Sequence, residues 1–165
     1  MPLPESTERR HDQAVQEIAR LRFAFPNEGH PDFKTYLNIP EPTMAVPNKE
    51  GDPICPDIVV TSTSRNVLQM MAVVESIGTV AEEKARSLWL PCSQLPVPFY
   101  LYVPLESVAE AKRVLKKLKI KVSGLRSWRY LVGFKTIEVA NIYDRLSPLA
   151  MLLPRALIPH RLLET

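Results

Sequence analysis

The chain of 165 residues has few glycines, few cysteines and no long apolar run, and each shortage disfavours a class of protein. Its five glycines form no glycine-rich phosphate loop, which disfavours the nucleotide-binding enzymes that depend on one. The two cysteines, Cys55 and Cys92, lack zinc-motif spacing and are too few for the disulfide framework of a secreted domain. No segment approaches the ~18 consecutive apolar residues of a membrane span.

Targeting signals and metal-ligand spacing are also missing. Residues 1–10 are polar and contain no apolar core, so they do not form a signal peptide. Together with reduced cysteines, this predicts a cytoplasmic protein without membrane contact. The three histidines, His11, His30 and His160, have no metal-ligand spacing, and we do not expect them to be catalytic. A net charge of +3 is too small to indicate nucleic-acid binding by itself.

Proline is abundant, with 16 residues that gather in 40–56, 91–104 and 148–159. Such clusters favour extended connections and the ends of helices and strands. The length and a hydrophobic content of 45% are typical of one globular domain with its own core. We predict a single domain over residues 1–145, followed by a proline-rich apolar arm over residues 146–165. The arm packs either on its own domain or on a second copy in a homodimer.

The order of periodic segments predicts an α/β fold. Apolar residues at helical spacing predict a first helix over residues 6–25. Capping boxes at Thr79 with Glu82 and at Ser107 with Glu110 predict two more helices. Strands are expected near 36–39, over 55–63, 67–75, 97–103, 120–125 and 129–132, with residues 134–145 forming a last helix or strand. Helices on both sides of one mixed sheet are the compact solution, so we predict a three-layer α/β/α domain.

Two carboxylates mark the candidate site. Asp57 follows Pro56 at the start of one apolar strand, and Glu75 ends the next strand. A three-residue turn between these strands places Asp57 opposite Val73, with Glu75 on the same face. The two acids then provide oxygen ligands for one Mg²⁺ ion. A two-residue turn would place them on opposite faces and remove this site.

Over residues 6–118 the chain resembles the PD-(D/E)XK nuclease superfamily, whose restriction-endonuclease-like core is helix, three-stranded meander, helix, strand. The resemblance implies that Asp57 and Glu75 hold Mg²⁺ and that a lysine two residues later assists the attacking water. Ile77 stands at that position. Lys84 in the next helix is a candidate for a migrated lysine. In an alternative alignment Val73 takes the acid position and Glu75 the lysine position, so either alignment lacks one group.

Some members of the superfamily carry an additional metal-directed acid on the first helix, and Glu17 matches its position. The ordinary interpretation of Glu17 is a solvated helix carboxylate. The third predicted helix and the strand after it carry many cations beside Trp128 and Tyr130. Such interleaving is typical of nucleic-acid binding, and the alternative is a solvated helix face. The predicted nucleic-acid-binding residues are Lys112, Arg113, Lys116, Lys117, Arg126 and Arg129.

These patterns predict a Mg²⁺-dependent nuclease-like domain that binds nucleic acid and has a degenerate site. If it cleaves phosphodiesters, Asp57, Glu75 and Lys84 are the predicted catalytic residues, and the first two are the metal ligands. The alternative is a non-catalytic assembly protein that uses its apolar arm for dimerisation.

Overall fold

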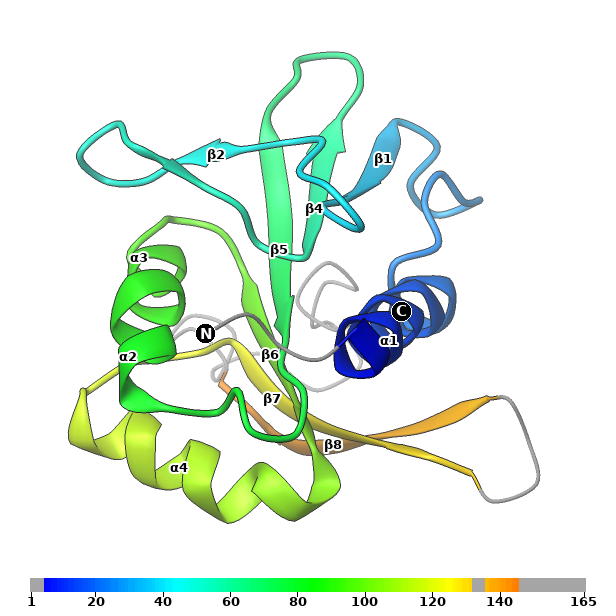
Figure 1. Ribbon diagram of the computed structural model, residues 1–165. Coiled ribbons are helices and arrows are strands. Elements are labelled where there is room, and N and C mark those ends of the chain that lie inside the picture. Colours follow the sequence, from blue (N-terminus) through cyan, green and yellow to red (C-terminus); the bar gives the residue numbers. More distant parts are fainter. Residues whose placement is uncertain (1–4, 132–135, 146–165) are drawn as a thin grey trace, which may run out of the picture.

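The computed structural model describes residues 5–131 and 136–145, in which a six-stranded mixed sheet carries helices on both faces (Figure 1). The strand order in the sheet is β1-β4-β5-β6-β7-β8. The strands are β1 Phe33–Leu37, β4 Ile58–Ser62, β5 Leu68–Val74, β6 Phe99–Pro104, β7 Gly124–Tyr130 and β8 Ile137–Asp144. A separate two-stranded hairpin consists of β2 Val46–Pro47 and β3 Pro53–Ile54. The predicted mixed α/β class is confirmed.

The sheet combines an antiparallel meander with parallel crossovers. Strands β1, β4 and β5 pair antiparallel in sequence order. Strand β6 then pairs parallel to β5, and β7 pairs parallel to β6. Helices occupy both crossovers, as parallel connections require. The last strand, β8, returns antiparallel to β7, so residues 137–144 form a strand and not a helix.

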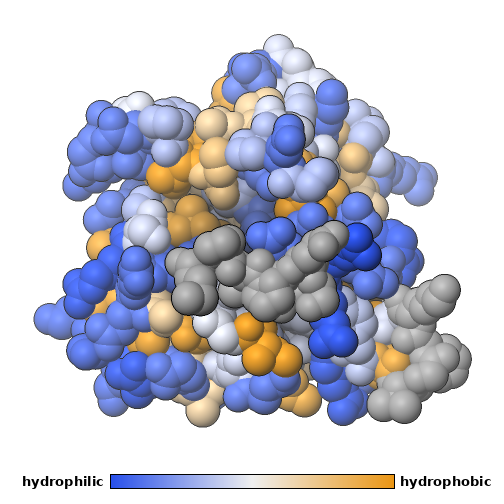
Figure 2. All heavy atoms as spheres, in the orientation of Figure 1, coloured by the Kyte–Doolittle hydropathy of each residue, from blue (hydrophilic) through white to orange (hydrophobic). Residues whose placement is uncertain are grey.

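Two cores lie on the two faces of the sheet because side chains alternate along each strand. Helix α1, Glu5–Arg22, covers one face with Ala14, Val15 and Ile18 fully buried. The other face is covered by α2 Glu82–Lys84, a π-helical turn Ala85–Trp89, α3 Leu90–Ser93 and α4 Val108–Lys117. On the face shown in Figure 2, hydrophobic residues form small groups between hydrophilic ones.

The register of β4 against β5 agrees with the one predicted from a three-residue turn. Ile58 pairs with Ala72, which continues to Asp57 opposite Val73. A bulge between Val60 and Thr61 shifts the register by one residue near the turn. The turn itself is therefore longer than predicted, and the bulge restores the alignment at the site end of the hairpin.

Several local predictions are wrong in detail. Neither Thr79 nor Ser107 caps a helix through its side chain, since α2 and α4 have no side-chain cap hydrogen bond. Pro91 does not end its helix but lies inside the second helical region, directly after the π-helical turn. Proline lacks an N–H group, and a π turn is one way for a helix to accommodate a lost hydrogen bond. The two strand segments expected over 120–132 are one strand, β7.

Among the described residues, no helix combines the length and apolar character needed to cross a bilayer. The predicted arm, residues 146–165, lies outside the described residues. Its role in a homodimer stays a prediction.

Candidate functional site

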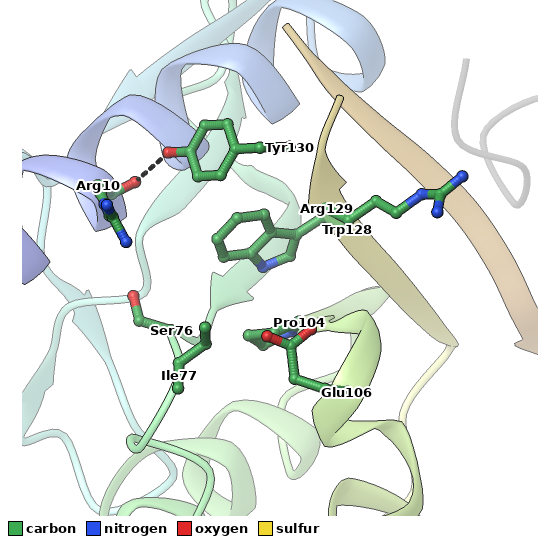
Figure 3. Close-up of a pocket in the computed structure, with 8 residues that line it drawn as sticks. All are labelled: Arg10, Ser76, Ile77, Pro104, Glu106, Trp128, Arg129 and Tyr130. Atoms are coloured by element: carbon green, nitrogen blue, oxygen red, sulfur yellow. Dashed lines mark hydrogen bonds between the residues drawn. The ribbon is translucent and has the colours of Figure 1, made fainter. Parts of the chain in front are cut away.

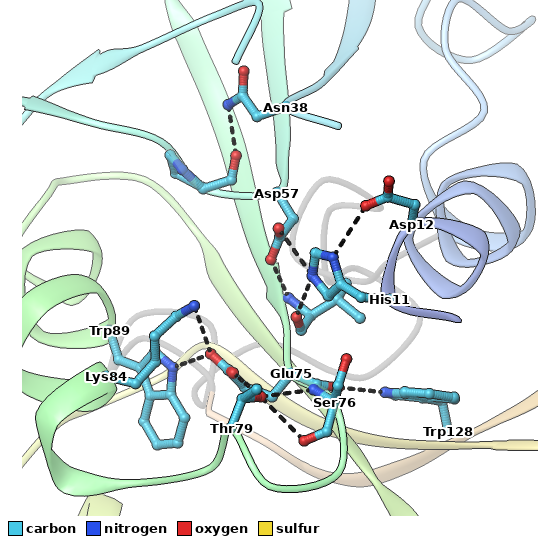
Figure 4. Close-up of polar contacts among 12 residues, drawn as sticks. His11, Asp12, Asn38, Asp57, Glu75, Ser76, Thr79, Lys84, Trp89 and Trp128 are labelled. Atoms are coloured by element: carbon cyan, nitrogen blue, oxygen red, sulfur yellow. Dashed lines mark hydrogen bonds and ion pairs between the residues drawn. The ribbon is translucent and has the colours of Figure 1, made fainter. Parts of the chain in front are cut away.

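Asp57 lies directly before β4, where it joins the end of β5 to α1. The Val74 N–H donates a hydrogen bond of 2.7 Å to Asp57 Oδ2. The other oxygen, Oδ1, lies 3.2 Å from Nε2 of His11, which α1 brings across the end of the sheet. Figure 4 shows His11 and Asp57 side by side between the helix and the strands. The carboxylate is therefore held by the backbone of β5 and by α1.

His11 is placed as an imidazolium. Its Nε2 lies 2.9 Å from the Val74 carbonyl oxygen, and its Nδ1 lies 3.3 Å from Asp12 Oδ1. Both ring nitrogens face acceptors, so the doubly protonated ring satisfies them best. Burial lowers the pKa of His11, but the hydrogen bond and charge of Asp57, aided by Asp12 and the Val74 carbonyl, raise it to about 9.

Glu75 is 1% exposed, and its carboxylate is satisfied by side chains from the following helical region. Trp89 Nε1 donates to Oε1 at 2.9 Å, and Thr79 Oγ1 donates to Oε2. Lys84 Nζ lies 3.9 Å from Oε1 (Figure 4). Burial raises the pKa of Glu75, while Lys84, Thr79 and Trp89 oppose that rise.

Both tryptophans of the chain hold Glu75, one from each face of the sheet. Trp89, in the core under α2 and α3, binds its carboxylate. Trp128, in the core under α1, donates from Nε1 to the Glu75 carbonyl oxygen at 3.0 Å. Residue 75 is thereby fixed in both its backbone and its side chain.

The chain turns immediately after Glu75, which explains the missing lysine. Strand β5 ends at Val74, and the Thr79 N–H donates to the Ser76 carbonyl oxygen in a turn. Ile77, at the expected lysine position, is 63% exposed and does not belong to either core. Lys84 supplies the cation beside Glu75 instead. Glu17 pairs with Arg20 at 3.0 Å on α1.

The acid pair, as arranged, does not fit a Mg²⁺ ion. Each of the four carboxylate oxygens already faces an N–H, O–H or cationic group of the chain. Mg²⁺ requires near-octahedral oxygen ligands, which these donors would have to vacate. Within residues 5–131 and 136–145, no group of three or more histidine, cysteine, aspartate or glutamate side chains could hold a metal ion.

A cysteine nucleophile is also disfavoured at this site. Cys92 is fully buried in α3. Burial, together with the charge of Asp57, raises the pKa of its thiol to about 12. The reactive thiolate is therefore scarce at neutral pH.

The structure disperses the predicted nucleic-acid-binding residues. Arg126 is 1% exposed and pairs with Asp144, so the prediction that it lies on the basic surface is wrong. Arg129 is exposed but pairs with Glu138 at 2.9 Å. On α4, Arg113 pairs with Glu110 at 2.6 Å. Lys117, on the same helix, lies 2.7 Å from a Glu82 oxygen. These four cations are engaged within the protein.

Two of the predicted residues belong instead to a different cluster of lysines. Lys112 and Lys116 line a shallow cavity of about 490 Å³ at the end of α4. Apolar residues and Tyr143, which is 38% exposed, complete its surface. We call this the lysine cavity; its cations are Lys112, Lys116, Lys119 and Lys121.

The sequence analysis assigned His11 no role in the site, although a signal for one existed. His11 lies three residues before Ala14 and so continues the apolar stripe of the first helix. A polar residue on that stripe must meet the sheet. The helix also ends earlier than predicted, at Arg22, and Leu21 is 39% exposed.

Comparison with known proteins gives no relative on which to base a function. No family model, curated protein or solved structure matches the chain. The functional argument therefore rests on the geometry of the chain itself.

Proposed function

We propose that this protein is a nucleic-acid-binding domain with a restriction-endonuclease-like core. The lysine cavity carries the functional part of this proposal. The four lysines that line it provide phosphate contacts, and Tyr143 in the same lining provides a surface on which a base can stack. The cavity lies at the carboxyl end of α4. The described ion pairs on that helix involve Arg113 and Lys117, so they do not neutralise the lysines of the cavity.

The order of elements supports the proposed core. A helix, α1, precedes the antiparallel strands β1, β4 and β5, and a helical region then leads to the parallel strand β6. This is the order that the resemblance implies. Asp57 and Glu75 stand at the start of the middle strand and just beyond the end of the third, close to the positions at which the resemblance expects its two acids.

In this proposal the acid pair stabilises the fold and does not drive metal-dependent cleavage. Asp57 ties β5 to α1 through His11, and Glu75 ties β5 to the opposite helices through Trp89. Removing one partner of a buried ion pair destabilises the folded protein, because the other charge is then left buried without a partner. The site is degenerate as a nuclease centre because protein donors occupy the positions that metal and water would need.

The test is binding of labelled single-stranded and double-stranded oligonucleotides, measured by fluorescence anisotropy at several salt concentrations. We expect affinity to fall as salt rises, and the double variant Lys112→Glu/Lys116→Glu to weaken binding about tenfold or more. The double variant Lys49→Glu/Arg65→Glu makes the same charge change in the β2–β3 and β4–β5 turns, far from α4 (Figure 1), and serves as the control.

Two results would contradict the proposal. One is the absence of oligonucleotide binding by the wild-type protein at low salt. The other is equal weakening by Lys49→Glu/Arg65→Glu and by Lys112→Glu/Lys116→Glu, which would indicate a response to net charge and no defined surface.

A further inference from the structure

A second cavity, of about 430 Å³, lies where the parallel strands β5, β6 and β7 end. Ligands of α/β proteins bind preferentially at the carboxyl ends of parallel strands, and this volume is within the range of small-molecule sites. Helix α1 closes one side (Figure 3). We call this the strand-end pocket. It is separate from the lysine cavity and shares none of its residues.

One wall of the strand-end pocket is aromatic and rigid. Figure 3 shows the Trp128 indole reaching toward the centre of the pocket from β7, with Tyr130 beside it. The two rings meet edge to face, with centroids 5.6 Å apart. The Tyr130 hydroxyl donates to the Arg10 carbonyl oxygen at 3.0 Å, which fixes this wall to α1. Across the pocket lies Ile77, an apolar side chain that is 63% exposed.

One cation faces the pocket and another faces away. Arg10, an exposed residue of α1, directs its guanidinium to the pocket rim (Figure 3). Arg129 also borders the pocket, but its guanidinium points away in Figure 3 and is held by Glu138. Among the described residues the pocket thus offers one guanidinium group, that of Arg10, which suits a phosphate.

Two further polar groups remain for a ligand. Ser76 is 4% exposed, and its buried hydroxyl has no hydrogen-bond partner within the described residues. Figure 3 shows this hydroxyl directed toward Arg10. Buried polar groups are nearly always satisfied, so an unsatisfied hydroxyl at a pocket indicates a missing partner. Glu106, after β6, adds a carboxylate that accepts from amino or hydroxyl groups.

We infer that the strand-end pocket binds one nucleoside monophosphate unit, either as a free nucleotide or as a nucleotide of a single strand. The base packs between the aromatic wall and Ile77, and the phosphate binds Arg10. Glu106 accepts from the base amino group or a ribose hydroxyl, and Ser76 completes the polar contacts. Base stacking on aromatic side chains tolerates different bases, so the pocket discriminates weakly among them. The single-strand case rests on the proposed nucleic-acid-binding function.

The experiment is a calorimetric titration of the full chain with AMP, GMP, CMP and UMP. Adenosine and inorganic phosphate test the two halves of the ligand separately. We expect Arg10→Gln to weaken AMP binding about tenfold and adenosine binding less than twofold, because only the phosphate contact is lost. Ile77→Glu, at an exposed position, should abolish binding of both AMP and adenosine, because it places a negative charge in the apolar wall of the pocket.

Arg129→Gln is the matched control. It removes the same kind of group from the same pocket border, but from a side chain that points away, and nucleotide affinity should change less than twofold. Failure of all four nucleotides to bind would overturn the inference. Equal effects of Arg10→Gln and Arg129→Gln would also overturn it.

The outcome is distinguishable from that of the proposed function. If oligonucleotides bind through the lysine cavity while nucleotides do not bind, this inference fails and the proposed function stands. If nucleotides bind and oligonucleotides do not, the strand-end pocket is a site for free nucleotides and the proposed function fails. A single-stranded oligonucleotide that competes with AMP identifies the strand as a source of the ligand.

Discussion

At the scale of single residues, the site consists of two acid and base pairs at the end of the central strands. Asp57 pairs with His11, which comes from α1, and Glu75 pairs with Lys84, which comes from the opposite helices. The two acids were identified in the sequence because Asp57 comes directly before one apolar strand and Glu75 directly after the next. His11 was not, since its role depends on where α1 crosses the sheet.

The His11 pair makes stability depend on pH. The pKa of His11 is about 9 in the folded protein and near 6.5 in the unfolded chain. A raised folded pKa gives stabilisation that is complete below about pH 6.5 and is lost as pH rises through about 9. The difference corresponds to about 3 kcal/mol. Urea unfolding should show this loss in the wild-type protein.

His11→Gln is the comparison for that measurement. It removes the titrating group, so the unfolding free energy of this variant should lack the same loss between about pH 6 and pH 9.5. Asp57→Asn should flatten the profile as well, because it removes the main charge that holds the proton. Parallel profiles for wild type and His11→Gln would contradict the assignment.

At the scale of elements, α4 shows which features of a helix follow from its own sequence and which depend on its backbone in the folded structure. Its position was predicted from the sequence, and the structure buries Ala111, Val114 and Leu115 on it. The helix ends through its backbone, with the Ile120 N–H donating to the Leu115 carbonyl oxygen at 2.9 Å. This closure requires Lys119 to adopt a positive φ of 55°.

Lys119→Gly should stabilise the protein by about 0.5–1 kcal/mol, because glycine adopts a positive φ without steric cost. Lys119→Ala keeps the Cβ atom and removes the same charge, so it should not stabilise. The measurement is the free energy of unfolding of both variants in denaturant. Equal effects of the two substitutions would assign the change to charge.

At the scale of the whole molecule, the two cores meet through the sheet, and the acid pair joins the helices on its two faces. Strand β4 and most of β5 are buried on both sides, in keeping with their continuous apolar sequences. Glu75 is held by a tryptophan from each core. A change at this position should therefore affect the packing of both layers.

Divalent cations should leave the stability of the molecule unchanged. A ligand that binds the folded state raises its melting temperature, so a shift reports binding. We expect millimolar Mg²⁺ or Mn²⁺ to give no shift and no calorimetric heat, because protein donors occupy the acid pair. A shift that disappears in both Asp57→Ala and Glu75→Ala would show that the ion displaces those donors.

The sequence by itself determined most strands of the six-stranded sheet and the position of both acids, because these follow from local periodicity and from the ends of apolar runs. Only the tertiary structure decided which charges meet. Arg126 is buried beside Asp144, His11 reaches Asp57 across 45 intervening positions, and four lysines line one cavity with Tyr143. Such pairings depend on how elements cross in space, and residue spacing along the chain does not encode that directly.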